Sequence, residues 1–191
     1  MQEGLQQHAD KKVFGFWVYL MTDLLMFAAL FATYAVLKDN TFGGPSGKEL
    51  FSLPFVLAET LILLTSSFTC GLMSLAAERG KKNQVIVWLT VTFLLGASFL
   101  GMELTEFHRL VIEGHGPSAN AFLSSFFTLV GTHGLHIAAG LLWIAVLTAV
   151  VWKRGVTEHV KNQLTRLALF WHFLDLVWIF IFTIVYLYAH I

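Results

Sequence analysis

Eight ionisable side chains lie inside long apolar stretches of this sequence, where an unpaired charge is costly in a membrane. They are Asp23, Glu59, Glu103, Glu106, His133, His136, His172 and Asp175. His172 and Asp175 have the three-residue spacing that places two side chains on one face of a helix. His133 and His136 share this spacing. We therefore expect a buried polar network that holds helices together and has a secondary influence on protonation.

The same residue types allow three other interpretations: a proton route, a haem held by two histidines, and a metal site. Haem ligation requires two histidines that face each other from different helices, and His133 or His136 opposite His172 would supply them. A di-metal helix bundle uses Glu-x-x-His pairs, whereas this sequence has His-x-x-Asp and His-x-x-His. The spacing therefore favours neither a haem nor a metal site, and the structural interpretation is preferred.

The composition indicates a membrane protein. The chain has 191 residues, of which 57% are hydrophobic and 13% charged, whereas soluble domains are about 45–50% apolar and about 25% charged. The net charge is zero, so no nucleic-acid partner is expected. The single cysteine, Cys70, excludes an internal disulfide and is interpreted as a small buried packing residue.

Hydropathy predicts an all-α membrane protein, a bundle of five transmembrane helices. The spans are residues 14–37, 55–77, 85–107, 121–152 and 166–191, preceded by a polar tail at 1–13. At about 1.5 Å per residue each span crosses the ~30 Å hydrocarbon core. The blocks show no alternation of hydrophobic and polar residues, so strands are not expected. The first span has full length after a polar start, so we expect it to be retained rather than cleaved as a signal.

The distribution of Lys and Arg predicts the orientation in the membrane. Nine lie on the side of the N-terminus, namely Lys11, Lys12, Arg79, Lys81, Lys82, Lys153, Arg154, Lys161 and Arg166. Three lie on the opposite side, namely Lys38, Lys48 and Arg109. Cytoplasmic loops carry the excess of positive charge. The N-terminus is therefore expected in the cytoplasm and the C-terminus outside, in the periplasm of a bacterium with two membranes.

Small residues at helical spacing predict where helices approach closely. Ala97 and Gly101 form one such stripe, and Ser124, Thr128 and Gly131 form another. Small side chains let helix backbones come together in lipid. We expect these stripes to lie at helix contacts.

Four segments in order resemble subunit III of the haem-copper oxidases. Residues 168–182, ALFWHFLDLVWIFIF, are similar to the W-H-F-x-D-x-V-W pattern of its final helix. Residues 131–140, GTHGLHIAAG, resemble its G-x-H-G-x-H-x-x-x-G helix, and residues 101–108, GMELTEFH, the segment before it. Residues 14–37 resemble the helix with the family's buried carboxylate. Together these matches extend over nearly the whole chain.

Two departures place the chain within that family. Mitochondrial-type subunit III has seven helices, whereas five are expected here, as in the short bacterial form. The buried carboxylate, usually Glu in cytochrome c oxidases, is Asp23. The segment at residues 43–60, GGPSGKELFSLPFVLAET, is similar to the version in cytochrome bo-type ubiquinol oxidases. Menaquinol oxidases and short-form cytochrome c oxidases remain alternatives.

The resemblance implies an accessory role in an aerobic respiratory complex of the bacterial inner membrane. Haem, copper, oxygen reduction and proton pumping would belong to the large catalytic subunit, subunit I. The resemblance thus implies that this chain has no catalytic, cofactor-binding or metal site of its own. Subunit III would pack against it, stabilise it and support proton uptake, with subunits II and IV as further partners. Larger relatives hold membrane phospholipid in a cleft, so phospholipid is also an expected partner.

Two rival classes follow from the residues alone. A haem-bearing membrane anchor would use the histidines as axial ligands. A small transporter would have spans broken by Gly or Pro near the middle of the membrane. Pro45, Pro54 and Pro117 lie in loops or at helix ends, which argues against the transporter.

Overall fold

Five long helices make up most of the molecule. The computed structural model describes the backbone of residues 2–41 and 52–190, and the side chains of residues 13–41 and 52–189. The helices are α1 (Gln2–Leu37), α3 (Leu53–Glu78), α4 (Lys82–Ile112), α5 (Ala121–Arg154) and α6 (Glu158–Ile181). α6 leads directly into a π-helix, η1 (Phe182–Leu187), and a short 3-10 helix, η2 (Tyr188–His190). This described part contains no strand.

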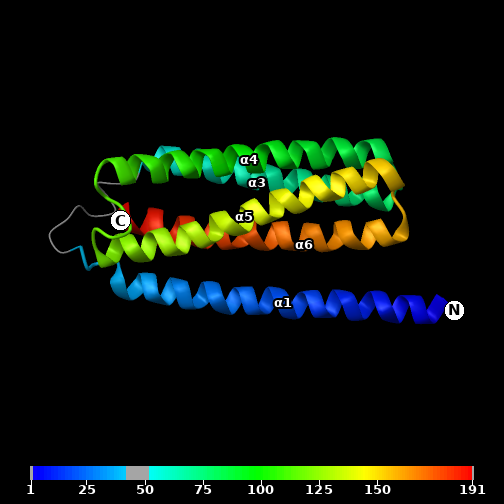
Figure 1. Ribbon diagram of the computed structural model, residues 1–191, viewed down its shortest axis with the longest axis horizontal. Helices are drawn as coiled ribbons and strands as arrows, with labels where there is room; N and C mark the ends of the chain where they lie inside the picture. The colour runs from blue at the N-terminus through cyan, green and yellow to red at the C-terminus, as the bar shows by residue number, and fades with distance from the viewer. Residues whose placement is uncertain (1, 42–51, 191) are drawn as a thin grey trace.

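The prediction of five spans is confirmed. Five helical stretches are long and apolar enough to cross a membrane: Val13–Leu37, Leu53–Glu78, Lys82–Ile112, Ala121–Arg154 and Glu158–Leu187. They lie side by side along the long axis of the molecule (Figure 1).

The helices extend beyond the predicted spans at their polar ends. α1 begins at Gln2, so the stretch predicted as a tail (1–13) is helical from residue 2 onward. α6 begins at Glu158 rather than at residue 166, and the Thr157 side chain accepts a hydrogen bond from the Val160 N–H (3.4 Å). Hydropathy detects only the apolar part of a helix. Backbone hydrogen bonding continues through polar turns, and a capping side chain decides where it starts.

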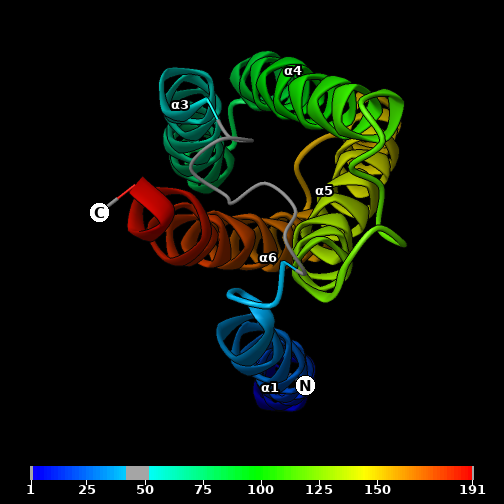
Figure 2. The same cartoon turned by 90° about the vertical axis from the view of Figure 1, so that its left-hand side faces the viewer.

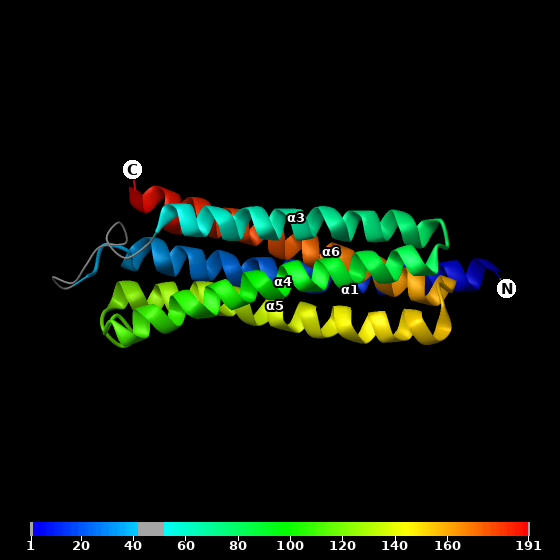
Figure 3. The ribbon, with the colours of Figure 1, turned by 90° about the horizontal axis from the view of Figure 1, so that it is seen from above.

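Four of the helices form a closed ring. α3 packs against α4, α4 against α5, α5 against α6, and α6 against α3. In the ring α3 lies opposite α5, and α4 lies opposite α6 (Figure 2 and Figure 3). The interior of this ring is where the large buried side chains gather, including Phe99, Phe126, Trp171 and Trp178.

α1 lies outside the ring, against α5 and α6 (Figure 2). Among the described side chains of α1, the buried ones are Leu20, Asp23, Phe27 and Tyr34, at spacings of three, four and seven residues. This is the pattern of a helix that packs along one narrow stripe. From residue 13 onward, α1 also has exposed apolar side chains such as Leu25 and Val36, which suit contact with lipid or with another protein.

Trp171 of α6 joins all three neighbouring helices of the ring. Its indole Nε1 donates a hydrogen bond to Ser66 Oγ of α3 (3.0 Å). Its ring lies so close to Gly96 of α4 and Gly140 of α5 that an ideal Cβ there would be 2.7 Å and 2.9 Å from it. Only a residue without a side chain leaves room for this indole at either place.

The predicted small-residue stripes do not mark the closest approaches. An ideal Cβ on Gly101 would meet nothing within 4 Å, and Ser124 and Thr128 are exposed. Spacing identifies a helical face, but the rotation of the helix in the bundle decides whether that face meets a neighbour.

Candidate functional site

The eight predicted residues occupy separate places in the bundle. Asp23 and His136 lie between α1 and α5. His172 and Asp175 lie between α6 and α3. Glu59, Glu103 and Glu106 lie together between α3 and α4, and His133 lies among aromatic rings inside the bundle. The prediction of one network therefore becomes a set of local clusters.

The first cluster joins α1 to α5. His136 Nδ1 donates a hydrogen bond to the Thr132 carbonyl (2.7 Å), because a carbonyl can only accept. This bond turns His136 Nε2 towards Asp23 Oδ2, at 3.8 Å. Tyr19, one turn before Asp23 on α1, interacts with the same carboxyl. The cluster gives α1 a polar attachment point on an otherwise apolar contact.

The second cluster joins α6 to α3. A hydrogen bond of 2.6 Å connects His172 Nδ1 and Ser67 Oγ, and Ser67 also interacts with the Asp175 carboxyl. Asp175 Oδ1 is buried and has no hydrogen-bond partner among the described residues. The His172 side chain, by contrast, is exposed on the outer surface of the bundle.

The third cluster holds three buried carboxyls near the end of the bundle where α3 begins and α4 ends. Glu106 Oε2 accepts a hydrogen bond from the Tyr186 hydroxyl (3.5 Å), and Arg109 lies 3.7 Å from Glu106 Oε1. Glu59 and Glu103 interact electrostatically with this group. Neither has a hydrogen-bond partner for its oxygens within the described chain. The three carboxyls therefore lie within electrostatic range of one another at this end of the bundle.

Tyr186 reaches this cluster from η1. The π-helix replaces the regular α-helical turn at the end of α6, and such segments re-aim side chains inside a helix. The Tyr186 side chain is fully buried.

His133 is enclosed by aromatic rings. It stacks on Trp178 (centroids 5.3 Å apart, 26° between planes) and meets Phe99 edge-on (6.1 Å, 87°). Neither ring nitrogen has a hydrogen-bond partner among the residues described. His133 therefore meets α6 at Trp178, whereas His172 of α6 points to Ser67 of α3. The two histidines do not form the facing pair that a haem would require.

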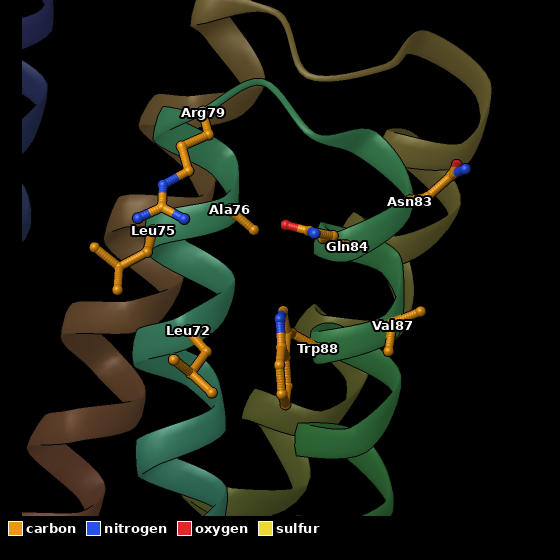
Figure 4. A pocket seen from close by; sticks show the side chains of 8 residues that line it. All are labelled: Leu72, Leu75, Ala76, Arg79, Asn83, Gln84, Val87 and Trp88. Carbon is orange, nitrogen blue, oxygen red and sulfur yellow. The ribbon is translucent and has the colours of Figure 1, made fainter.

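Within the described residues, no group of three or more His, Cys, Asp or Glu side chains is arranged to hold a metal ion. A hollow of about 520 Å³ between the adjoining ends of α3 and α4 is lined by Leu72, Leu75, Ala76, Arg79, Asn83, Gln84, Val87 and Trp88 (Figure 4). It includes none of the eight predicted residues.

Sequence reasoning missed several side chains that complete these clusters. Trp178 Nε1 donates to Thr60 Oγ1 of α3 (3.0 Å), just as Trp171 donates to Ser66. The seven-residue spacing of Trp171 and Trp178 was a signal that both lie on one face of α6. Nothing in the sequence pointed to Tyr186, because the π-helix shifts its direction.

The fold and these clusters define a class: a multi-pass membrane protein whose buried polar groups lie between helices. The family follows from comparison with known proteins. The model of the family "Cytochrome c oxidase subunit III" matches residues 6–190, so the chain belongs to that family. The protein is therefore a multi-pass protein of the bacterial inner membrane.

Three relatives show the range of similarity. The chain is 64% identical to cytochrome bo(3) ubiquinol oxidase subunit 3 of Pseudomonas aeruginosa, over 92% of this chain and 84% of the relative. It is 46% identical to quinol oxidase subunit 3 of Bacillus subtilis, over 92% of this chain and 86% of the relative. It is 48% identical to cytochrome c oxidase subunit 3 of Bacillus sp. (strain PS3), over 92% of this chain and 85% of the relative. The resemblance noted in the sequence is thus confirmed.

Proposed function

We propose that the chain is the third subunit of a proton-pumping quinol:oxygen oxidoreductase in an aerobic respiratory chain. The observation that carries this proposal is the 64% identity to a cytochrome bo(3) ubiquinol oxidase subunit 3 over most of the chain. The relative named for cytochrome c oxidase is less similar, at 48%. Ubiquinol oxidase is therefore preferred to the cytochrome c form.

The subunit is proposed to be non-catalytic. Haem and copper would lie in the large subunit, subunit I, and subunits II and IV and membrane phospholipid would complete its surroundings. The local clusters support this role, because each consists of side chains that connect two helices. His133 would have to lose its contacts with Phe99 and Trp178 to bind a haem. This argues against the alternative, a haem-bearing anchor.

The N-terminus is proposed to lie in the cytoplasm. The beginning of α1, the α3–α4 connection and the α5–α6 connection share one end of the bundle (Figure 1). That end carries Arg79, Lys81, Lys82, Lys153 and Arg154, in agreement with the positive-inside rule.

Substitution of Asp23 by Asn tests the accessory role. Asn has the shape of Asp but no charge, so the variant should assemble with its haem- and copper-containing partner and still reduce oxygen. Asp39→Asn, at an exposed position after α1, is the matched control. A purified complex with Asp23→Asn, full haem content and no oxidase activity would refute the non-catalytic role.

Co-purification tests the assignment to an oxidase. The tagged chain, extracted in mild detergent, should bring a haem- and copper-containing subunit with it. After that partner is stripped away, the isolated chain should show no Soret band. A Soret band that stays with the isolated chain would support the haem-bearing anchor.

A further inference from the structure

We propose that the outer groove between α3 and α6 is the surface on which a transmembrane helix of a partner subunit packs, and that this helix presents a hydrogen-bond donor to Asp175. The proposal rests on the proposed function, because it assumes that the chain works inside a membrane complex. It adds which face of the bundle meets the partner and what chemistry the partner offers.

The groove runs along both helices. One part, of about 480 Å³, is lined by residues that include Leu64, Ser67, Phe68 and Asp175. A second part, of about 240 Å³, is lined by residues that include Ser74 and Ala168. Gly71 and His172 line both parts, so the two are continuous. On α3 the lining extends from Leu64 to Glu78, about 20 Å at 1.5 Å per residue. This length suits a packed helix.

The groove presents polar groups halfway along the spans. His172 lies midway between Glu158 and Leu187, the ends of the last span, and its side chain is exposed. His172 Nδ1 is hydrogen-bonded to Ser67, but Nε2 would lose its hydration in contact with lipid tails, which is unfavourable. Asp175 lines the groove. Its Oδ1 is shielded inside the chain, so the accessible part of the carboxyl is what a partner in the groove would meet. A lipid chain can offer this carboxyl no donor, whereas a side chain of a neighbouring helix can.

The walls of the groove also allow the backbone of another helix to approach closely. Gly71, Ser74 and Ala168 line it, and small residues of this kind are enriched where membrane helices meet. The charged residues that line it, Glu78 and Lys161, lie at the end away from Asp175. A partner helix would therefore meet a polar centre with small residues on one side.

The outer faces of α4 and α5 differ from the groove in the polar groups that they present. Their exposed large side chains include Leu94, Leu104, Leu135, Leu142 and Val146. The exposed hydroxyls of Ser98 and Thr105 donate to carbonyls of their own helix. This surface suits lipid and needs no polar partner.

Site-specific photocrosslinking distinguishes the two faces. A photoreactive phenylalanine analogue, benzoylphenylalanine, is placed at Phe68 in the groove or, as a matched control, at Leu142 on α5; their side chains are 67% and 68% exposed. In membranes that contain the intact complex, we expect a crosslink to a partner subunit from position 68 and none from position 142. A protein crosslink from position 142 alone, or only lipid adducts at position 68, would overturn the inference. In either case, haem that still co-purifies would leave the proposed function standing.

Variants of Asp175 test the hydrogen bond. Asp175→Leu removes the acceptor, and we expect about three- to tenfold less haem-containing partner to co-purify under stringent detergent, given the modest strength of hydrogen bonds between membrane helices. Asp175→Asn keeps an acceptor oxygen and should retain most of the partner. Leu142→Ala is the control and should retain all of it. Equal retention by Asp175→Leu and the control would contradict a role for this carboxyl.

Discussion

The indole of Trp171 occupies the space that a side chain at Gly96 would need, since an ideal Cβ there would lie 2.7 Å from the ring. The same indole closes against Gly140 and donates to Ser66 Oγ. One side chain of α6 thus sets the distance to α3, α4 and α5. Two glycines and one tryptophan thus bring the four helices of the ring together at one level.

Gly96→Ala should destabilise the protein. The added methyl group must displace the indole, and overpacking of this kind costs about 1–3 kcal/mol. We expect a lower melting temperature of the purified complex in detergent. Gly101→Ala is the control on the same helix, because no atom lies within 4 Å of its Cβ position. Alanine there should leave the melting temperature unchanged or raise it, since glycine is the poorer helix former. Equal melting of the two variants would show that the contact is not tight.

Thr60→Val should weaken the contact between α3 and α6. Valine keeps the shape of threonine but leaves the Trp178 N–H without its acceptor, at a cost of about 1–3 kcal/mol for a buried donor. Thr65→Val serves for comparison, because Thr65 is exposed and its hydroxyl donates to Leu61 of its own helix. Denaturation in increasing concentrations of a harsh detergent measures the difference. If Thr60→Val resists the detergent as well as Thr65→Val does, the hydrogen bond contributes nothing measurable to stability.

His133→Phe should preserve assembly and haem content. Aromatic rings, among them Phe99 and Trp178, already surround His133. Neither of its ring nitrogens has a hydrogen-bond partner in the described part of the structure. His136→Phe removes the ring nitrogen that faces Asp23 and is expected to loosen α1 from the bundle. Haem per complex, measured by pyridine haemochromogen spectra, should equal the wild-type value for His133→Phe. Loss of one haem in that variant would identify His133 as a ligand.

Labelling with a membrane-impermeant maleimide checks the orientation. In spheroplasts, Glu113→Cys should react from outside, whereas Lys153→Cys should react only after the membrane is opened. Both positions are exposed at opposite ends of the bundle, and the native Cys70 is buried. The reverse pattern would mean that the N-terminus lies outside.

The sequence by itself determined the number of spans, because hydropathy is a local property of the chain and membrane helices satisfy their backbone hydrogen bonds internally. The spacing of His172 and Asp175 likewise placed both on one face of α6. Their order in the chain, together with the neighbouring motifs, was enough to indicate the family.

Only the tertiary structure decided which groups meet. Ser67 is hydrogen-bonded to His172 although the two are 105 positions apart in the sequence. Tyr186 and Glu106 are hydrogen-bonded across 80 positions. The same holds for Gly96 and Gly140, which matter because Trp171 of another helix lies against them, whereas the predicted stripe at Gly101 meets nothing. Contacts of this kind depend on how each helix is rotated and shifted against its neighbours. That rotation is settled by the packing of the whole ring, and local spacing does not contain it.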